Sequence, residues 1–228
     1  MTQPRPQAVF FDLDGTLVDT APDMAAALNT VLAENGGDPL PFEVIRRQVS
    51  NGGAGLIRLA FGEVLDTPRG DELRARFLEI YRQRLCQDSQ LFPGMEALIS
   101  DLEKRGIPWG VVTNKPAWLT EPLLKELTVD HRACCIVSGD TLTERKPHPA
   151  PLLHAAKLSG TDPEACVYVG DARRDIEAGR AAGMATVAAL FGYIPDDERP
   201  PEWQADVEIH HPAELTRWLF HLDGEAAS

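Results

Sequence analysis

Short apolar runs alternate with helical patterns along most of this chain, and that alternation limits the possible folds more than any other feature. The apolar runs have the length and composition of buried strands and lie at residues 8–11, 109–113, 136–138, 167–169 and 186–190. Helical patterns occupy residues 95–104, 119–127, 150–159 and 176–182. Strands that alternate with helices predict an α/β fold, a Rossmann-like parallel sheet with helices on both faces.

One long segment interrupts this alternation. It contains helical patterns and few strand signals, and turns rich in proline and glycine separate the patterns. The patterns lie at residues 22–35, 42–49, 54–61 and 71–86. We therefore expect an α/β core of residues 1–20 and 91–228 and an inserted α-helical cap of residues 21–90. Hinges are expected near residues 17–20 and 90–94.

The first apolar run leads into Asp12-Leu13-Asp14-Gly15-Thr16. Carboxylates two residues apart on an extended chain lie on the same side, so Asp12 and Asp14 can face one site. Two neighbouring anions repel each other unless a cation lies between them or one of them keeps its proton. The pair is therefore suited to a nucleophile, a proton donor and a metal ion.

Polar motifs also follow three later runs: Thr113-Asn114-Lys115-Pro116, Lys146-Pro147, and a Gly170-to-Asp175 segment that contains Asp171. Each motif alone has an ordinary explanation, such as a helix cap or a surface loop. The carboxyl ends of parallel strands meet at one edge of the sheet, where such folds bind ligands. The four motifs together therefore predict a single site.

Composition restricts the partners and the compartment. The net charge is −13 at pH 7 and no basic stripe is present, which argues against nucleic acid as a partner. No apolar stretch is long enough to span a membrane, and the first residues lack the apolar region of a signal peptide. Four cysteines without a CxxC motif are typical of a reducing compartment. We expect a cytoplasmic monomer or homodimer. If the substrate is an anion, local cations must offset the overall negative charge around it.

The four motifs, in this order, resemble the haloacid dehalogenase superfamily, and in particular its phosphatases with a helical cap after the first strand. The resemblance covers nearly the whole chain. Residues 111–116 and 139–142 are similar to the phosphoglycolate phosphatase group, whereas residues 192–194, 203–206 and 211–212 look more like N-acetylmuramic acid 6-phosphate phosphatases. One departure is His148, where an acidic or small residue is usual; we interpret it as a plain loop residue.

The resemblance implies a role for each core residue. Asp12 would attack phosphorus and form an aspartyl-phosphate, and Asp14 would donate a proton to the leaving oxygen and later take one from water. Crowding by Asp12 and Asp171 is expected to raise the pKa of Asp14. Thr113 would bind a phosphoryl oxygen, and Lys146 would neutralise the transferring charge.

The resemblance also implies a magnesium cofactor. Mg²⁺ would bind Asp12, the backbone carbonyl of Asp14, Asp171 and water molecules, because hard cations prefer oxygen ligands. Asp175 would not bind the metal directly but would orient those water molecules or Lys146.

The cap is expected to close over the edge of the sheet and to exclude water. Its bare backbone at Asn51, Gly52 and Gly53 would approach the substrate, and the region of Asn114 would complete the phosphate cradle. The candidates for binding a substrate carboxylate are Arg58, Arg46 and Arg47. Tyr193 and Trp203 are candidates to border a sugar, although buried packing is the more common role of such aromatic residues.

These inferences predict a Mg²⁺-dependent phosphatase of small phosphate monoesters. The candidate substrates are N-acetylmuramic acid 6-phosphate, an intermediate of peptidoglycan recycling, and 2-phosphoglycolate. A sugar phosphomutase of the same fold uses the same aspartates and remains an alternative. A phospho-acceptor signalling domain also combines acidic residues with a lysine, although the helical insertion and Asp14 argue against it.

Overall fold

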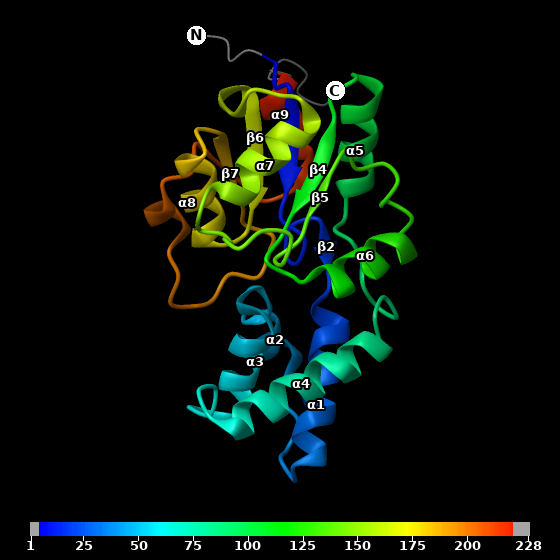
Figure 1. Cartoon of the computed structure of the whole chain (residues 1–228), viewed down its shortest axis with the longest axis vertical. Coiled ribbons are helices and arrows are strands. Elements are labelled where there is room, and N and C mark those ends of the chain that lie inside the picture. The colour runs from blue at the N-terminus through cyan, green and yellow to red at the C-terminus, as the bar shows by residue number, and fades with distance from the viewer. Residues whose placement is uncertain (1–4, 221–228) are drawn as a thin grey trace, which may run out of the picture.

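The computed structural model describes residues 5–220, and its core is a parallel sheet with the strand order β5-β4-β1-β6-β7-β8 (Figure 1). The central strand β1 pairs with β4 on one side and β6 on the other. The strands are β1 (Ala8–Phe11), β4 (Trp109–Val112), β5 (Ile136–Val137), β6 (Cys166–Gly170), β7 (Ala185–Ala189) and β8 (Val207–Ile209). The predicted α/β fold is therefore confirmed.

Alternating residues of β1 explain why the sheet has helices on both faces. Val9 and Phe11 belong to one apolar cluster, and Ala8 and Phe10 belong to another. Successive side chains of a strand point to opposite faces, so a strand without polar residues needs cover on both. The first cluster takes in α5 (Met95–Lys104), α6 (Ala117–Glu126) and α9 (Pro212–Phe220), and the second α7 (Ala150–Ser159) and α8 (Arg173–Ala181).

Four further helices lie between the first and second strands of the sheet in sequence, and they form a separate lobe in Figure 1. Leu28, Leu56 and Phe77, from three of these helices, are fully buried and belong to the larger apolar cluster. The elements of the lobe are α1 (Ala21–Glu34), α2 (Phe42–Arg46), the short 3-10 helix η1 (Val49–Asn51), α3 (Gly52–Phe61) and α4 (Pro68–Gln83).

A two-stranded antiparallel ribbon joins the lobe to the sheet. It pairs β2 (Val18–Asp19) with β3 (Gln90–Leu91), and Val18 lies opposite Leu91. The sequence analysis expects hinges in these two segments, and the ribbon holds both passages of the chain side by side. Strand β8 and helix α9 (Pro212–Phe220) were not predicted from the sequence. The sequence also predicts a frayed tail at residues 223–228, which lie outside the described residues.

Within residues 5–220, no helix combines the length and apolar character that crossing a membrane requires. All four cysteines carry free thiols.

Candidate active site

Asp12 directly follows β1, and a tight turn carries the chain from it to Asp14. The Asp12 amide continues the sheet by donating to the carbonyl of Val169, and the amides of Leu17 and Val18 then donate to the Leu13 carbonyl. Gly15 has a φ of +88°, and a Cβ there would lie 2.0 Å from an Asp171 carboxylate oxygen. Only glycine fits this turn, since any side chain would push Asp171 aside.

Lys146 lies beneath Asp12 and is 3% exposed. Its Nζ is 2.9 Å from Asp12 Oδ1 and 2.8 Å from Asp175 Oδ1, and it also donates to the Tyr168 hydroxyl. Asn114 fixes the backbone of this lysine, because its amide both donates to the Lys146 carbonyl and accepts from the Lys146 amide. The Asn114 side chain thus braces Lys146, a contact that the sequence analysis did not anticipate.

The surroundings of Asp12 favour its charged form. Burial by itself would raise the pKa of this carboxyl, but the charges of Lys146 and Arg174 and the hydrogen bonds from Lys146 and the Leu13 amide lower it below its usual value. Asp12 is therefore an ionised carboxylate held in place by a buried ammonium, which is the state that a nucleophile requires.

Asp12, Asp171 and Asp175 form a buried carboxylate cluster, whose nearest oxygen atoms all lie within 4.8 Å of one another. Burial, together with the charges of Asp12 and Asp175, raises the pKa of Asp171 to about 7. Asp171 Oδ2 accepts hydrogen bonds from the Tyr193 amide and the Ser50 hydroxyl, both at 2.7 Å.

The donor set of this cluster fits a divalent cation. The charges of Lys146 and Arg174 act on Asp12 and Asp175, so when Asp171 is also ionised the three carboxylates share two cations. Oxygen ligands at this spacing suit a hard divalent ion, and such an ion would relieve the repulsion that raises the pKa of Asp171. The cluster is thus a candidate metal centre.

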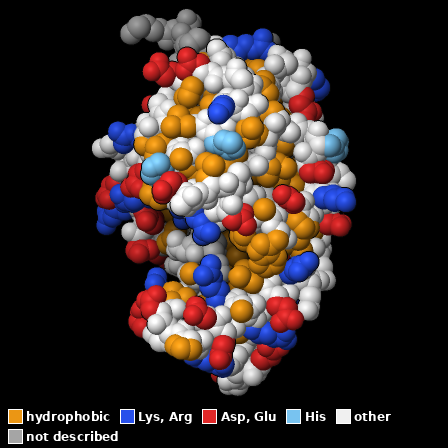
Figure 2. All heavy atoms as spheres, in the orientation of Figure 1, with side chains coloured by type: hydrophobic (Ala, Val, Ile, Leu, Met, Phe, Trp, Pro, Cys, Tyr) orange, Lys and Arg blue, Asp and Glu red, His pale blue; other side chains and the backbone are white. Residues whose placement is uncertain are grey.

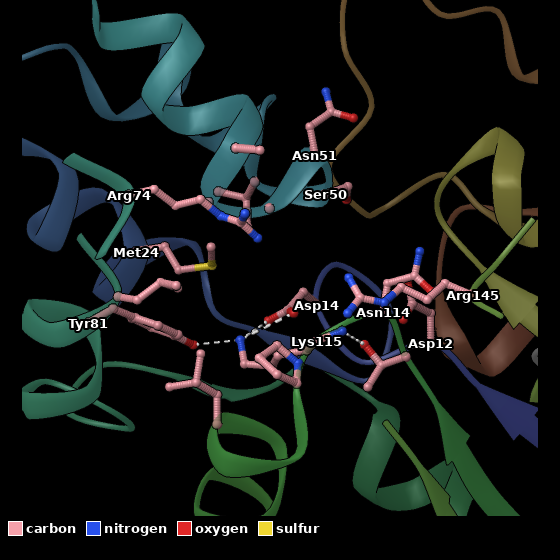
Figure 3. Close-up of a pocket in the computed structure, with 18 of the residues that line it drawn as sticks. Asp12, Asp14, Met24, Ser50, Asn51, Arg74, Tyr81, Asn114, Lys115 and Arg145 are labelled. Carbon is pink, nitrogen blue, oxygen red and sulfur yellow. Dashed lines mark hydrogen bonds and ion pairs between the residues drawn. The ribbon is translucent and has the colours of Figure 1, made fainter. Parts of the chain in front are cut away.

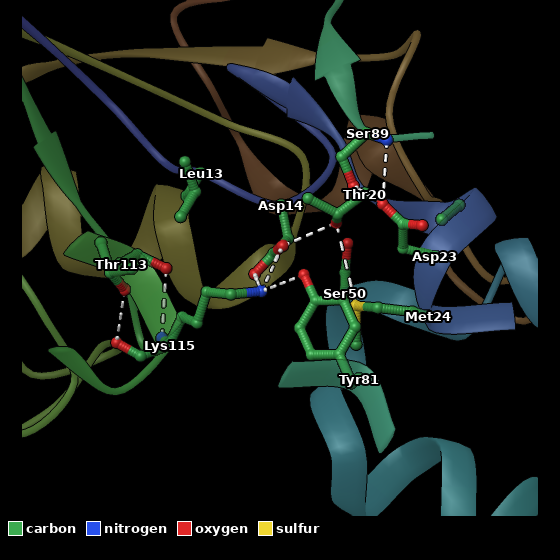
Figure 4. A network of polar contacts seen from close by, with 12 residues as sticks. Leu13, Asp14, Thr20, Asp23, Met24, Ser50, Tyr81, Ser89, Thr113 and Lys115 are labelled. Atoms are coloured by element: carbon green, nitrogen blue, oxygen red, sulfur yellow. Dashed lines mark hydrogen bonds and ion pairs between the residues drawn. The ribbon is translucent and has the colours of Figure 1, made fainter. Parts of the chain in front are cut away.

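The Asp14 side chain lies outside this cluster and has other partners. Its Oδ1 accepts from the Thr20 hydroxyl at 2.6 Å and from Lys115 Nζ at 2.9 Å (Figure 4). The same ammonium also donates to the Tyr81 hydroxyl at 2.9 Å. The sequence analysis expects Asp12 and Asp171 to crowd Asp14, whereas the structure places a lysine against it.

The buried side chains of Lys115 and Tyr81 also influence each other. Burial would lower the pKa of Lys115, but Asp14 and Tyr81 raise it above its usual value. Burial raises the pKa of Tyr81 to about 12, so its hydroxyl remains protonated. Lys115 is therefore a charged ammonium between the core and helix α4.

A cavity of about 300 Å³ lies between the helical lobe and the carboxyl ends of the strands (Figure 3). Figure 2 shows basic side chains beside the hollow at this waist of the molecule. Four cationic side chains and two carboxylates line the cavity, so the local balance of charge is positive although the chain carries −13. The charged lining residues are Asp12, Asp14, Arg74, Lys115, Arg145 and Arg174.

Several residues predicted from the sequence line this cavity. Thr113, which is 4% exposed, lies at its floor, and its Oγ1 accepts from the Lys115 amide. Asn51, Gly52 and Gly53 form part of its cap side, and Gly52 has a φ of +65°. Asn51, Gly52 and Gly53 therefore line the same cavity as Asp12 and Asp14.

The three arginine candidates from the sequence lie outside this cavity. Arg58 pairs with Glu63 and lines a separate hollow. Arg46 donates to the carbonyls of Phe191 and Gly192, and Arg47 pairs with Asp196. Each of these arginines contacts a neighbouring residue, and none of them lines the cavity.

The aromatic candidates and His148 have structural contacts. Tyr193 is fully buried, with its hydroxyl donating to Asp19 and accepting from the Ala21 amide. Trp203 is buried and donates to Glu198. His148 is exposed and accepts from the Ala150 amide at the start of α7, which agrees with a plain loop residue.

Sequence reasoning missed the roles of Lys115, Arg174, Ser50, Tyr81 and Arg74. Lys115 and Arg174 lie inside the motifs at residues 113–116 and 170–175, so their position in the sequence is a signal that points to them. Ser50, Tyr81 and Arg74 belong to cap segments, and no local pattern indicates which face of a cap helix meets the core.

Comparison with known proteins agrees with this geometry. The family model described as haloacid dehalogenase-like hydrolase matches residues 9–189. A phosphoglycolate phosphatase of Xanthomonas campestris pv. campestris (strain 8004) is 47% identical over 210 residues, which cover 92% of this chain and 95% of the relative. An N-acetylmuramic acid 6-phosphate phosphatase of Pseudomonas aeruginosa is 41% identical over 215 residues, which cover 94% and 95%.

A solved structure shares the whole architecture. It is the crystal structure of a predicted phosphoglycolate phosphatase from Haemophilus somnus 129pt, with a TM-score of 0.84 and 28% identity over 95% of this chain and 99% of that one. Fold, carboxylate site and relatives together define a phosphoric monoester hydrolase, whose substrate is a phosphate ester. The chain belongs to the haloacid dehalogenase-like hydrolase family.

Proposed function

We propose that the chain is a Mg²⁺-dependent phosphatase that passes the phosphoryl group of a small monoester through Asp12. The observation that carries this proposal is the different setting of the two carboxylates at the cavity. Asp12 is held by Lys146 beside the carboxylate cluster, and Asp14 is held apart by Thr20 and Lys115. Such a division suits one nucleophile and one proton carrier.

The first step is attack by an Asp12 oxygen on phosphorus. A bond forms between that oxygen and phosphorus, the ester bond breaks, and Asp14 gives a proton to the leaving oxygen. Thr113 Oγ1 accepts from the Lys115 amide, which leaves its hydroxyl hydrogen available for a phosphoryl oxygen. Lys146 offsets the negative charge at Asp12.

The second step is hydrolysis of the aspartyl-phosphate. Asp14, now ionised, takes a proton from a water molecule, whose oxygen attacks phosphorus and releases Asp12. Inorganic phosphate and the original carboxylate of Asp12 result, so each cycle restores the enzyme.

Asp12 and Asp171, with the Asp14 carbonyl, are the proposed metal ligands, and Asp175 is proposed to support them through Lys146. When bound, Mg²⁺ would neutralise phosphoryl oxygens and the excess charge of the cluster. The protein itself orients Asp171 through the hydroxyl of Ser50 and the amide of Tyr193.

We propose that residues 21–90 act as a cap that excludes bulk water from the phosphate site. Two contacts near the metal centre support this role. The Ser50 hydroxyl donates to Asp171, and Arg174 donates to the Ser50 carbonyl at 2.7 Å. The cap segment that carries Asn51, Gly52 and Gly53 is thereby held over the cavity.

The proposed substrate is N-acetylmuramic acid 6-phosphate, with 2-phosphoglycolate as the second candidate. Both names occur among relatives that cover nearly the whole chain. A cavity of about 300 Å³ reaches the usual range of small-molecule sites, about 300–1,000 Å³, and can hold a sugar ring. The two-carbon acid would leave much of that space to water.

Arg74 is the proposed partner of the substrate carboxylate. It extends from α4 into the cavity (Figure 3), and its guanidinium forms no ion pair or hydrogen bond with any group of residues 5–220. Arginine binds a carboxylate through two parallel hydrogen bonds, which a planar guanidinium can offer to a bound ligand.

Phosphate release from a panel of esters with Mg²⁺ tests the proposal. We expect multiple turnovers, fastest with N-acetylmuramic acid 6-phosphate, and no requirement for a bisphosphate activator. Release that depends on a sugar bisphosphate would favour the phosphomutase. A single stoichiometric phosphorylation without turnover would favour a phospho-acceptor domain. The free thiols agree with the cytoplasmic location that we propose for this reaction.

A further inference from the structure

Lys115 is a buried cation that the reaction steps described above leave without a task. It is 8% exposed, it follows β4 immediately after Thr113 and Asn114, and it lines the cavity. Lysine is rarely buried, since removing its charge from water is costly unless partners compensate. The partners of Lys115 are therefore a guide to what it does.

Its contacts connect Asp14 of the core to Tyr81 of helix α4. Nζ lies 2.9 Å from Asp14 Oδ1, 3.2 Å from Asp14 Oδ2 and 2.9 Å from the Tyr81 hydroxyl (Figures 3 and 4). Nζ also lies 4.6 Å from the centre of the Tyr81 ring, and Tyr81 is 1% exposed. The ammonium is thus fixed from the cap side as well as by the carboxylate.

The two buried lysines of the site serve different aspartates. Lys146 contacts Asp12 and Asp175, whereas Lys115 contacts both oxygens of Asp14. Apart from Lys115, the Asp14 carboxylate accepts a hydrogen bond from Thr20, which binds Oδ1. A single hydrogen bond to one oxygen leaves the carboxylate free to rotate. The contacts of Lys115 with both oxygens remove that freedom.

We infer that Lys115 is the positioning residue for Asp14: together with Tyr81 it aims the Asp14 carboxyl at the leaving oxygen of the substrate. This inference rests on the proposed function, in which Asp14 is the proton carrier. Proton transfer requires the donor to lie within hydrogen-bond reach of the leaving atom, so a loose carboxyl loses rate. Lys115 acts through orientation and does not itself take part in proton transfer.

A comparison of two esters separates this role from others. An alkyl phosphate has a leaving oxygen that needs a proton, whereas the nitrophenolate of p-nitrophenyl phosphate departs without one. Single-turnover release of the leaving group, with enzyme in excess, measures the transfer to Asp12 alone. We expect Lys115→Met to slow this step about 10- to 100-fold for the alkyl ester and less than about 3-fold for the nitrophenyl ester.

Four further variants make the test decisive. Lys115→Arg should recover most of the alkyl rate, since it restores a cation, and Tyr81→Phe should lose a smaller part of it. Lys125→Met, which removes an exposed lysine on α6, is the matched control and should behave like the wild type. Adding Lys115→Met to Asp14→Asn should cause no further loss with the alkyl ester, because the group being positioned is already gone.

Other results would overturn the inference. Equal losses with both esters would make Lys115 part of phosphoryl binding, and a raised KM with an unchanged kcat would make it a substrate ligand. If Lys115→Met does not fold, a Lys115→Arg variant that lowers both rates equally leads to the same rejection. A wild-type protein that releases neither leaving group would instead refute the proposed phosphatase, and the role of Lys115 with it.

Discussion

At the residue scale, each aspartate of the site is defined by the group that it contacts. Asp12 and Asp14 are two residues apart, yet Lys146 holds the first and Lys115 the second. Asp171 accepts from Ser50 and the Tyr193 amide, and Asp175 accepts from the Ala172 amide as well as facing Lys146. The chemistry therefore depends on pairings between distant segments as much as on the local motif.

The sequence motifs identified the strand ends, and so they identified Asp12, Thr113, Lys146 and Asp171 as neighbours. They could not identify the partner of Asp14. Which charged group lies nearest to a carboxylate depends on side-chain rotamers and on the cap, and neither is encoded in the spacing of a motif. The same limit explains why Arg74 was missed in favour of Arg58, which pairs with Glu63.

Replacement of Lys146 by methionine tests the importance of its buried charge. Asp12 and Asp175 would remain as buried carboxylates without their ammonium, so we expect a loss of about 3–5 kcal/mol in the free energy of unfolding. We also expect kcat to fall by about 100-fold or more. Urea denaturation and steady-state kinetics measure the two effects, and the exposed Lys157→Met on α7 is the control. A variant with wild-type kcat would remove Lys146 from the mechanism.

At the element scale, helix α4 provides both a contact to the core and the proposed substrate anchor. The ring of Tyr81 packs against the Lys115 ammonium. Arg74 lies on the same helix, seven residues earlier in the chain. Residues separated by seven positions lie on one face of an α-helix. Helical periodicity therefore places both side chains on the face of α4 that meets the cavity.

Arg74→Ala tests the substrate anchor. If its guanidinium binds the lactyl carboxylate, kcat/KM for N-acetylmuramic acid 6-phosphate should fall about 10- to 100-fold. N-acetylglucosamine 6-phosphate lacks that carboxylate, and its kcat/KM should change by less than about 3-fold. Arg69→Ala, on the same helix and paired with Glu72, serves as the control. Equal losses with both sugars would assign Arg74 to the phosphate or to cap stability.

The sequence predicted the long elements well and the short ones poorly. The helices over residues 95–104 and 150–159 have the predicted bounds, because their apolar spacing is regular. The ribbon strands are two residues each, too short for any periodicity, and β8 has three residues with an exposed Glu208 at its centre. Pairing with neighbours, rather than a local pattern, makes these segments strands.

At the scale of the whole molecule, the charge of −13 and the positive cavity have complementary consequences. The surplus of acidic residues favours the approach of a divalent cation and opposes that of an anionic ester. The cations that line the cavity make the local charge positive, which favours the approach of an anion there. The proposed metal ion and the proposed substrate would thus be attracted by charges of opposite sign.

The pKa of Asp171 predicts how Mg²⁺ stabilises the fold at different pH values. Because the folded metal-free state keeps a proton on Asp171 up to about pH 7, its stability falls as the pH rises from about 4 through 7. Mg²⁺ binds the ionised form, so the increase in Tm caused by MgCl₂ should be larger at pH 8 than at pH 6. Thermal unfolding with MgCl₂ or EDTA at both pH values measures this increase. An increase that is equal at both, or that persists in Asp171→Asn, would contradict the assignment.

The most direct measurement for the central claim is the capture of phosphate on Asp12. Acid quenching during turnover, followed by peptide mass spectrometry, should find an acid-stable, base-labile phosphoryl group on the peptide that contains residue 12. The group should be absent in Asp12→Asn. A phosphorylated Asp12→Asn protein, or rapid hydrolysis by a wild-type enzyme that never carries phosphate at residue 12, would contradict the account.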